Sequence, residues 1–295
     1  SMHTMAKVKN LALADGDRPE PSMRVLGEEQ VVGAADQLIA NTAAEALDLQ
    51  QLYGAPARQT SVVYPGVDLE QFSPGDQTAA RRLHGIDANA TVLLFVGRIQ
   101  PLKGLTIAVQ ALAELTDRRS RLVVVGGPSG SDGPDELARV RSMIAELGLR
   151  DRVSFVEPQP HHRLSTFYRA ADVVVVPSRS ESFGLVALEA AACGVPVVAA
   201  AVGGLRTLVD DGVSGHLIDS RRPSDFAVRI DELLADPAAA AAMGRAASEL
   251  ADRYAWSTTA GRLRRLYGDL RARALVEFFT VLPYFFAGAL AGVTE

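Results

Sequence analysis

The stretch Asp172-Val-Val-Val-Val-Pro177, followed closely by Glu181-Ser-Phe-Gly-Leu-Val-Ala-Leu-Glu189, decides the fold of this chain. Four consecutive valines that end at a proline indicate a short strand buried on both faces, as strands of parallel sheets are. Good helix formers follow over residues 185–193, and Gly194 is placed to end that helix. The order strand, loop, helix puts the loop beyond the carboxyl end of a strand, where open α/β sheets bind ligands.

The loop and the start of this helix combine features that suit a sugar nucleotide. Unpaired N–H groups at a helix start attract an anion, most naturally a phosphate. Glu181 and Glu189 bracket the helix start, and carboxylates are better suited to hydroxyls than to a phosphate. A sugar nucleotide offers both groups. Two solvated glutamates at a helix end account for this window equally well.

Alternating apolar runs and helical stretches extend the pattern. The apolar runs cover residues 91–96, 122–125, 153–156, 173–176, 196–199 and 215–219. Further helices are expected at 224–234, 237–254 and 257–271. Repeated βα units of this length predict a doubly wound parallel sheet with right-handed crossovers. Residues 73–271 are therefore expected to form a complete Rossmann-like α/β domain.

The segments on either side of this domain differ from it. Residues 1–72 offer short strands at 38–42 and 61–64, a helix at 27–35, and another that Thr42 caps and Gly54 ends. We expect them to be the remnant of a domain that began upstream. Residues 272–295 are apolar, but a membrane-spanning helix needs about 20 apolar residues, and this run is shorter and contains Pro283. We expect it to pack against protein or to be a non-native terminus; membrane contact is the less favoured alternative.

Charge and cysteine content limit the classes of partner. The chain has 295 residues, a net charge of −5 and no basic run, so we expect no nucleic-acid partner. A single cysteine, Cys193, excludes an internal disulfide and fits a reducing compartment, and we expect a cytoplasmic protein. The position of Cys193 among alanines indicates a small buried residue rather than a nucleophile.

A second polar constellation follows the first strand of the regular domain, in Val96-Gly-Arg-Ile-Gln-Pro-Leu-Lys-Gly104. The carboxyl ends of parallel strands meet at one sheet edge, so we expect Arg98 and Lys103 over the same edge as the Glu181 loop. A guanidinium and an ammonium suit a diphosphate, the first through a forked contact and the second as a point charge. Taken alone, two exposed cations on a loop are the simpler interpretation.

Three other motifs are less specific. Gly126-Gly-Pro-Ser-Gly130 matches a dinucleotide fingerprint poorly, because Pro128 interrupts it and no G-x-G-x-x-G follows. His161 and His162 are adjacent and do not face one ligand on a helix, so we expect both on the surface. The turn Val202-Gly-Gly-Leu205 follows another strand and is a candidate to face a donor.

Gly97-Arg-Ile-Gln-Pro-Leu-Lys103, Glu181-Ser-Phe-Gly-Leu-Val-Ala-Leu-Glu189 and Ala200-Ala-Val-Gly-Gly204 together resemble the retaining GT-B glycosyltransferases of family 4. The front stretches His3-Thr-Met-Ala-Lys-Val-Lys-Asn10 and Arg24-Val-Leu-Gly-Glu-Glu-Gln30 are similar to the D-inositol-3-phosphate glycosyltransferases of mycothiol biosynthesis in actinobacteria. The resemblance covers residues 3 to about 270. It implies a GT-B fold with a complete C-terminal donor domain and a partial N-terminal, acceptor-side domain.

The resemblance also implies roles for individual residues. Arg98, Lys103 and Glu181 match catalytic positions, of which the two cations hold the donor diphosphate and Glu181 lies beside the donor-sugar hydroxyls. Glu189 matches the glutamate that binds the ribose hydroxyls. Further donor contacts are implied for the backbone of Phe183, Gly184 and Leu185, acceptor contacts for His3, Thr4 and Arg24, and a backbone Mg²⁺ position for Tyr168, Arg169 and Ala171.

The implied reaction is transfer of N-acetylglucosamine from UDP-N-acetylglucosamine (UDP-GlcNAc) to 1D-myo-inositol 3-phosphate with retention of the anomeric configuration. No cofactor is required, because two cations take the place of a catalytic metal; a structural Mg²⁺ and a homodimer are open alternatives. Loss of the start of the first domain would remove one wall of the cleft and with it most of the rate. A non-catalytic nucleotide-sugar-binding module and a family 4 transferase with a different acceptor therefore stay as alternative functions.

Overall fold

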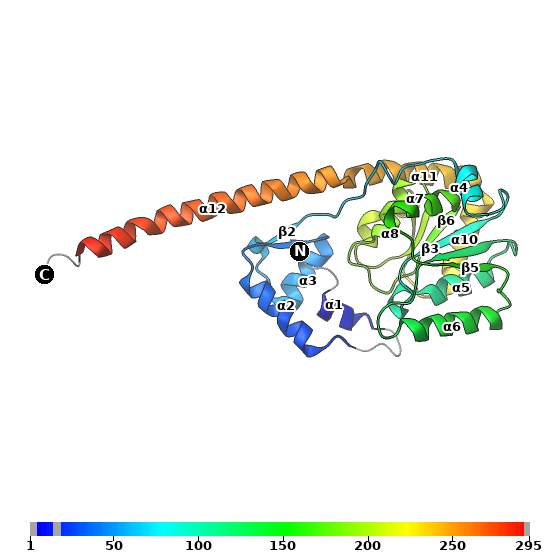
Figure 1. Ribbon diagram of the computed structural model, residues 1–295, viewed down its shortest axis with the longest axis horizontal. Helices are drawn as coiled ribbons and strands as arrows, with labels where there is room; N and C mark the ends of the chain where they lie inside the picture. The colour runs from blue at the N-terminus through cyan, green and yellow to red at the C-terminus, as the bar shows by residue number, and fades with distance from the viewer. Residues whose placement is uncertain (1–4, 14–18, 292–295) are drawn as a thin grey trace.

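The computed structural model of the protein describes residues 5–13 and 19–291, with side chains as far as residue 275. Figure 1 shows a large sheet domain, a smaller N-terminal unit beside it, and one long helix that runs past the smaller unit. The elements of the described residues are α1 Ala6–Leu11, α2 Ser22–Ala34, β1 Leu38–Ala40, α3 Ala43–Tyr53, η1 Ala57–Gln59, β2 Thr60–Val62, α4 Gln77–Leu83, β3 Val92–Val96, η2 Pro101–Lys103, α5 Leu105–Glu114, β4 Arg121–Val125, α6 Gly133–Glu146, β5 Val153–Val156, α7 His161–Ala170, β6 Val173–Val176, α8 Leu185–Ala192, β7 Val197–Ala200, α9 Leu205–Leu208, β8 Gly215–Ile218, α10 Pro223–Ala235, α11 Pro237–Ala251, η3 Asp252–Tyr254 and α12 Trp256–Ala291.

The parallel strands of the large sheet are ordered β5-β4-β3-β6-β7-β8. β3 lies at the centre, where Leu93 pairs with Leu122 of β4 on one side and with Val173 of β6 on the other. The chain therefore builds the sheet outward from β3 in two opposite directions, which makes the β3–β6 boundary its switch point. This order confirms the predicted doubly wound parallel sheet, in which ligands bind beyond the carboxyl ends of the strands at the switch point.

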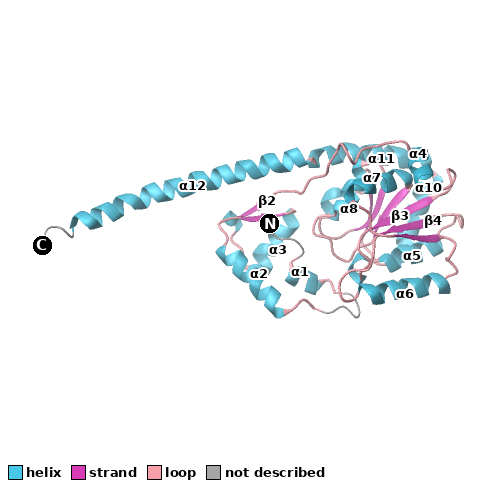
Figure 2. Cartoon of the chain, in the orientation of Figure 1, coloured by secondary structure: helices cyan, strands magenta, loops and turns pink. Residues whose placement is uncertain are grey.

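The valine block of β6 shows that the sheet is covered on both faces. Val174 and Val176 belong to the core that includes α7, α8 and α11, whereas Val173 and Val175 belong to the core that includes α5, α6 and α10. Side chains alternate along a strand, so two covered faces require a continuous apolar run. Figure 2 shows the helices on both sides of the magenta strands.

The N-terminal unit pairs β1 with β2 in a parallel two-stranded sheet and packs α3 against it, while α1 contacts α2 and α3. Leu38 of β1 and Leu49 of α3 are buried in its own small core. As predicted, Thr42 caps α3, because its Oγ1 accepts a hydrogen bond of 3.0 Å from the N–H of Glu45. Gly54 ends α3 in the left-handed conformation, with a φ of 68°.

Two helices extend well beyond their predicted bounds. α2 begins at Ser22 rather than at 27, because Arg24 forms ion pairs with Glu20 and Glu28, one turn away on either side. α12 continues from Trp256 through the predicted end at 271 to Ala291. The side chains beyond 275 lie outside the description, so the packing of the last segment stays a prediction. Among the described residues, no helix combines the length and the apolar character that a bilayer crossing requires.

The cysteine and the surface charge agree with the composition. Cys193 is 4% exposed, and burial raises the pKa of its thiol to about 12. A thiol that stays protonated is a weak nucleophile, which confirms the predicted small buried residue.

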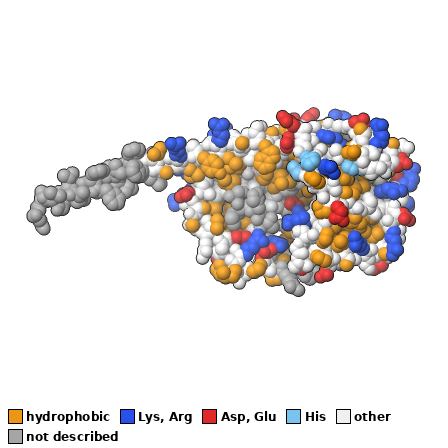
Figure 3. Space-filling model, in the orientation of Figure 1, with side chains coloured by type: hydrophobic (Ala, Val, Ile, Leu, Met, Phe, Trp, Pro, Cys, Tyr) orange, Lys and Arg blue, Asp and Glu red, His pale blue; other side chains and the backbone are white. Residues whose placement is uncertain are grey.

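Figure 3 shows basic and acidic side chains interspersed over the face that it draws.

Candidate functional site

Two loops meet at the switch point of the sheet, one after β3 and one after β6. Gly104, which precedes α5, has a φ of 69°, and a Cβ there would lie 2.3 Å from the carbonyl oxygen of Pro177. Glycine alone accommodates both this backbone conformation and this close approach. The contact holds the end of the first loop against the start of the second.

The Arg221 guanidinium reinforces the same junction from the segment between β8 and α10. It donates hydrogen bonds of 2.9 Å to the carbonyl oxygens of both Pro177 and Ser178. Burial, together with the charge of Arg179, lowers the pKa of Arg221 to about 10, so the side chain stays charged at neutral pH. Sequence reasoning missed Arg221, because no local motif marks a residue that supports two loops far away in the chain.

The junction brings Lys103 and Glu181 together, as the shared sheet edge predicts. The Lys103 ammonium donates a hydrogen bond of 2.7 Å to Glu181 Oε2, which also accepts one of 3.2 Å from Ser178 Oγ. The Lys103 and Glu181 side chains are 19% and 17% exposed, so the pair is shielded yet accessible. An ammonium has three N–H donors, and this contact leaves two of them for an anion.

Two cavities meet at the exposed Arg98, and one of them holds the Lys103–Glu181 pair. The first, of about 330 Å³, is lined by Arg98, Lys103 and Glu181 on the side of the sheet and by Lys9 and Glu45 on the side of the N-terminal unit. The second, of about 300 Å³, lies over the loops that follow β3 and β4. Arg98 lines both cavities, so one elongated ligand in contact with Arg98 can extend into each.

The turn Val202-Gly-Gly-Leu205 supports the Glu181 loop. The N–H of Gly204 donates a hydrogen bond of 2.9 Å to the carbonyl of Glu181. A Cβ on Gly203 would lie 2.0 Å from that carbonyl oxygen, and one on Gly204 would lie 2.2 Å from the carbonyl oxygen of Phe183. Val202 and Gly203 also line the first cavity, so the turn both packs against the Glu181 loop and faces the site.

α8 begins directly after this loop. Gly184 precedes it with a φ of 106°, Phe183 is buried, and Leu185 is 44% exposed. The three residues predicted to make backbone contacts with a donor therefore lie at the start of the helix, where its first N–H groups lack helical partners.

Glu189 lies one helical turn further along α8 and is buried. Its Oε2 accepts a hydrogen bond of 2.7 Å from the Tyr168 hydroxyl, and its Oε1 is 2.8 Å from His161 Nε2. Burial, followed by the nearby Glu189 charge, raises the pKa of Tyr168 well above its usual value. His161 is exposed, as expected, but sequence reasoning missed its contact with Glu189.

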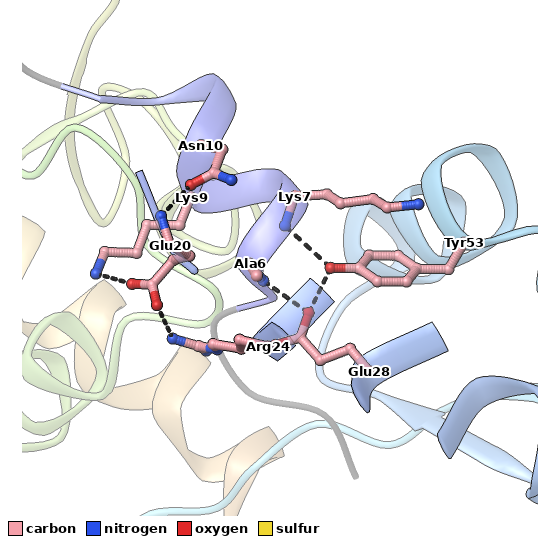
Figure 4. Close-up of polar contacts among 8 residues, drawn as sticks. All are labelled: Ala6, Lys7, Lys9, Asn10, Glu20, Arg24, Glu28 and Tyr53. Carbon is pink, nitrogen blue, oxygen red and sulfur yellow. Dashed lines mark hydrogen bonds and ion pairs between the residues drawn. The ribbon is translucent and has the colours of Figure 1, made fainter. Parts of the chain in front are cut away.

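Of the predicted acceptor residues, His3 and Thr4 lie outside the described residues. Arg24 belongs to the polar network of the N-terminal unit that Figure 4 shows: it donates 2.7 Å to Glu20 Oε2 and 3.0 Å to Glu28 Oε1. Lys9 donates a hydrogen bond to the other oxygen of Glu20. Because Lys9 lines the first cavity, Glu20 links Arg24 to the cavity wall.

At the predicted Mg²⁺ position, two of the three backbone carbonyls already accept hydrogen bonds. The carbonyl of Tyr168 accepts a hydrogen bond of 3.0 Å from the N–H of Ala171, and that of Ala171 accepts one of 2.9 Å from Gln77 Nε2. Within the described part of the chain, no group of three or more His, Cys, Asp or Glu side chains could hold a metal ion. We therefore derive no step through a cation, and the Mg²⁺ position stays a prediction.

Proteins of similar sequence cover most of this chain. The sequence profile described as "Glycosyl transferases group 1" matches residues 76–250. The D-inositol 3-phosphate glycosyltransferase of Thermobispora bispora is 53% identical over 92% of this chain and 65% of its own length. The protein of the same name from Frankia alni is 53% identical over 93% of this chain and 69% of its own length. The chain thus spans about two thirds of the length of these relatives.

Solved structures show the same fold. Sucrose-phosphate synthase from Thermosynechococcus elongatus superposes with a TM-score of 0.85 at 33% identity, over 92% of this chain and 67% of that one. HepE from Anabaena, solved in complex with UDP-glucose, superposes with a TM-score of 0.78 at 28% identity, over 84% of this chain and 68% of that one. These similarities confirm the predicted GT-B fold.

Proposed function

The chain belongs to the group 1 glycosyltransferase family, and from this premise we propose that its sheet edge binds UDP-GlcNAc. The proposed reaction transfers N-acetylglucosamine to 1D-myo-inositol 3-phosphate with retention, as a step of mycothiol biosynthesis in the cytoplasm. The names of the two relatives support the acceptor, and the complex of HepE with UDP-glucose supports a UDP-sugar as donor.

The observation that carries the proposal is the Lys103–Glu181 contact of 2.7 Å at the switch point, with Arg98 lining the same cavity. Two cations beside one carboxylate suit a diphosphate that is attached to a hydroxyl-bearing sugar. Lys103 holds Glu181 toward the sugar hydroxyls and keeps two N–H donors for the diphosphate. Arg98 and Lys103 then stabilise the negative charge that grows on the departing UDP.

The two cavities suggest how the donor lies. The cavity over the β3 and β4 loops is lined mainly by apolar and backbone groups, among them Gly97, Gly126 and Pro158, and suits a flat base. The cavity between the sheet domain and the N-terminal unit holds the Lys103–Glu181 pair and suits the sugar. Arg98, which lines both, is then placed beside the diphosphate that joins the two parts.

The acceptor is proposed to enter from the N-terminal unit. Lys9 and Arg24 share the Glu20 carboxylate, and Arg24 also pairs with Glu28, so an acceptor phosphate competes with these carboxylates for the two cations. Glu45 and Asp48 line the first cavity and offer acceptors to a polyol ring. Transfer to a different sugar acceptor is the alternative. It predicts that Arg24→Glu leaves acceptor use unchanged.

Calorimetry with UDP, on chain shown to be folded by circular dichroism, tests the donor site first. Incubation with UDP-GlcNAc and 1D-myo-inositol 3-phosphate, followed by proton NMR of the product, then tests transfer and its stereochemistry. Because the chain spans about two thirds of the length of its named relatives, binding without transfer is the second candidate function. UDP binding with no product from this or any other sugar acceptor would favour that candidate, and no UDP binding would exclude both.

A further inference from the structure

The Glu189 carboxylate has one protein donor on each oxygen. The Tyr168 hydroxyl contacts Oε2 at 2.7 Å from the interior, where Tyr168 is fully buried. His161 Nε2 contacts Oε1 at 2.8 Å from the outside, where the His161 side chain is 62% exposed. Glu189 itself keeps 8% of its side chain exposed. The carboxylate is therefore held by one hydrogen-bond donor from the interior and one from the surface.

Both donors come from one face of α7. Positions seven apart lie two turns from each other on the same side of a helix, which is the spacing of His161 and Tyr168. The buried Phe72 packs against both rings, with centroids 4.9 Å from His161 and 6.0 Å from Tyr168. Gln71 Nε2 also donates a hydrogen bond of 3.0 Å to the His161 carbonyl. The two donors are thus fixed by the segment that leads out of the N-terminal unit.

A carboxylate has about four acceptor sites, two on each oxygen. Tyr168 and His161 use one on each, so one remains on Oε1 and one on Oε2. One acceptor site on each oxygen of a carboxylate suits two vicinal hydroxyls, which is the pattern of a ribose. A glutamate without fixed partners has a broad terminal torsion and loses that freedom on binding, which weakens affinity.

We propose that His161 and Tyr168 are positioning residues that hold Glu189 ready to accept hydrogen bonds from the two ribose hydroxyls of the donor nucleotide. The inference rests on the proposed UDP-sugar site and adds two residues to it. Neither side chain has to touch the nucleotide. Their effect on affinity passes through Glu189 and therefore depends on the ribose hydroxyls.

This dependence separates positioning from a purely structural role. The probes are UDP and 2′,3′-dideoxy-UDP, which lacks both hydroxyls, titrated calorimetrically into the wild-type chain, His161→Ala and Tyr168→Phe. The control is His162→Ala, which changes the neighbouring exposed histidine. We expect His161→Ala to bind UDP up to about tenfold more weakly, since the freed Glu189 side chain must then be ordered on binding, and to bind dideoxy-UDP as the wild type does. His162→Ala should match the wild type with both probes.

An equal loss of affinity for both nucleotides in His161→Ala would overturn the inference, as would unchanged affinity for UDP. Tyr168→Phe should show the same dependence on the hydroxyls; if this buried change prevents folding, the exposed His161 variant decides alone. The proposed function is judged separately. It fails if the folded wild-type chain binds neither nucleotide, whereas wild-type binding of UDP with no hydroxyl-dependent loss in His161→Ala rejects the positioning role only.

Discussion

Lys103 and Glu181 lie 78 positions apart in the chain, and their side chains form a hydrogen-bonded ion pair of 2.7 Å. One follows β3 and the other follows β6, the two strands at the switch point of the sheet. Because each side chain is less than a fifth exposed, the pair is screened from bulk solvent more than a surface ion pair is, and loss of either partner leaves the other with a poorly compensated charge.

Lys103→Met tests the contribution of this ammonium to donor binding. We expect affinity for UDP to fall about ten- to a hundredfold, since a hydrogen bond to a charged group contributes about 1.5–3 kcal/mol. Isothermal calorimetry at constant salt measures the change. Arg119→Met is the control, because the Arg119 side chain is 90% exposed and lies outside both cavities. Equal UDP affinity in Lys103→Met and the wild type would contradict the assignment.

Regular topology explains how much of the site was predictable. The valine run at 173–176 and the βα rhythm predict a parallel sheet, and a parallel sheet places Arg98, Lys103 and Glu181 at one edge. The contact of His161 with Glu189 was not predictable, because it depends on how α7 and α8 pack side by side. The role of Arg221 was not predictable for a similar reason. Its guanidinium donates a hydrogen bond to the Pro177 carbonyl across the sheet edge, and no local sequence motif indicates that contact.

The roles of individual glycines were likewise not predictable from the sequence. Gly104 and Gly148 have nearly the same φ, 69° and 67°. A Cβ on Gly104 would lie 2.3 Å from the Pro177 carbonyl oxygen, whereas a Cβ on Gly148 would have no described neighbouring atom within 4 Å. Gly148→Ala should cost about 1–2 kcal/mol for the left-handed conformation. Gly104→Ala should cost about 1–3 kcal/mol more, because the neighbouring backbone must move.

Urea unfolding of the two alanine variants measures this difference directly. The comparison cancels the conformational cost that both share and leaves the steric one. Equal free energies of unfolding would show that the two loops at the switch point separate easily, and that Gly104 does not hold them together.

Arg81 and Asp172 form an ion pair of 2.8 Å near the opposite end of the strands from the candidate site. Arg81 is 5% exposed and also donates to the carbonyls of Ala170 and Ala88. Arg81→Met should destabilise the fold by about 3 kcal/mol, because it removes three hydrogen bonds of a buried guanidinium, at about 1 kcal/mol each. Arg82→Met, at the exposed neighbouring position, is the matched control. A similar unfolding free energy for the two variants would argue against this contribution.

Glu45 gives the chain a predictable dependence on pH. It is 5% exposed, and burial raises the pKa of its carboxyl to about 7, against hydrogen bonds from Asn41 that lower it. In the unfolded chain the carboxyl titrates near 4.5. Between these two values the folded chain holds a proton that the unfolded chain has released, so stability falls as pH rises. Above pH 7 both states are ionised, and the contribution of Glu45 becomes constant.

Glu45→Gln removes this titration and keeps an oxygen that can accept from the Asn41 N–H. The stability of the variant relative to the wild type should therefore rise by about 3 kcal/mol between pH 4.5 and 7.5, since one pKa unit corresponds to about 1.4 kcal/mol. Urea unfolding at several pH values in this range measures the difference, and other groups cancel because they titrate in both proteins. Glu249→Gln, which changes an exposed glutamate of α11, is the matched control. A constant difference between Glu45→Gln and the wild type would mean that the Glu45 carboxyl ionises equally in the folded and unfolded states.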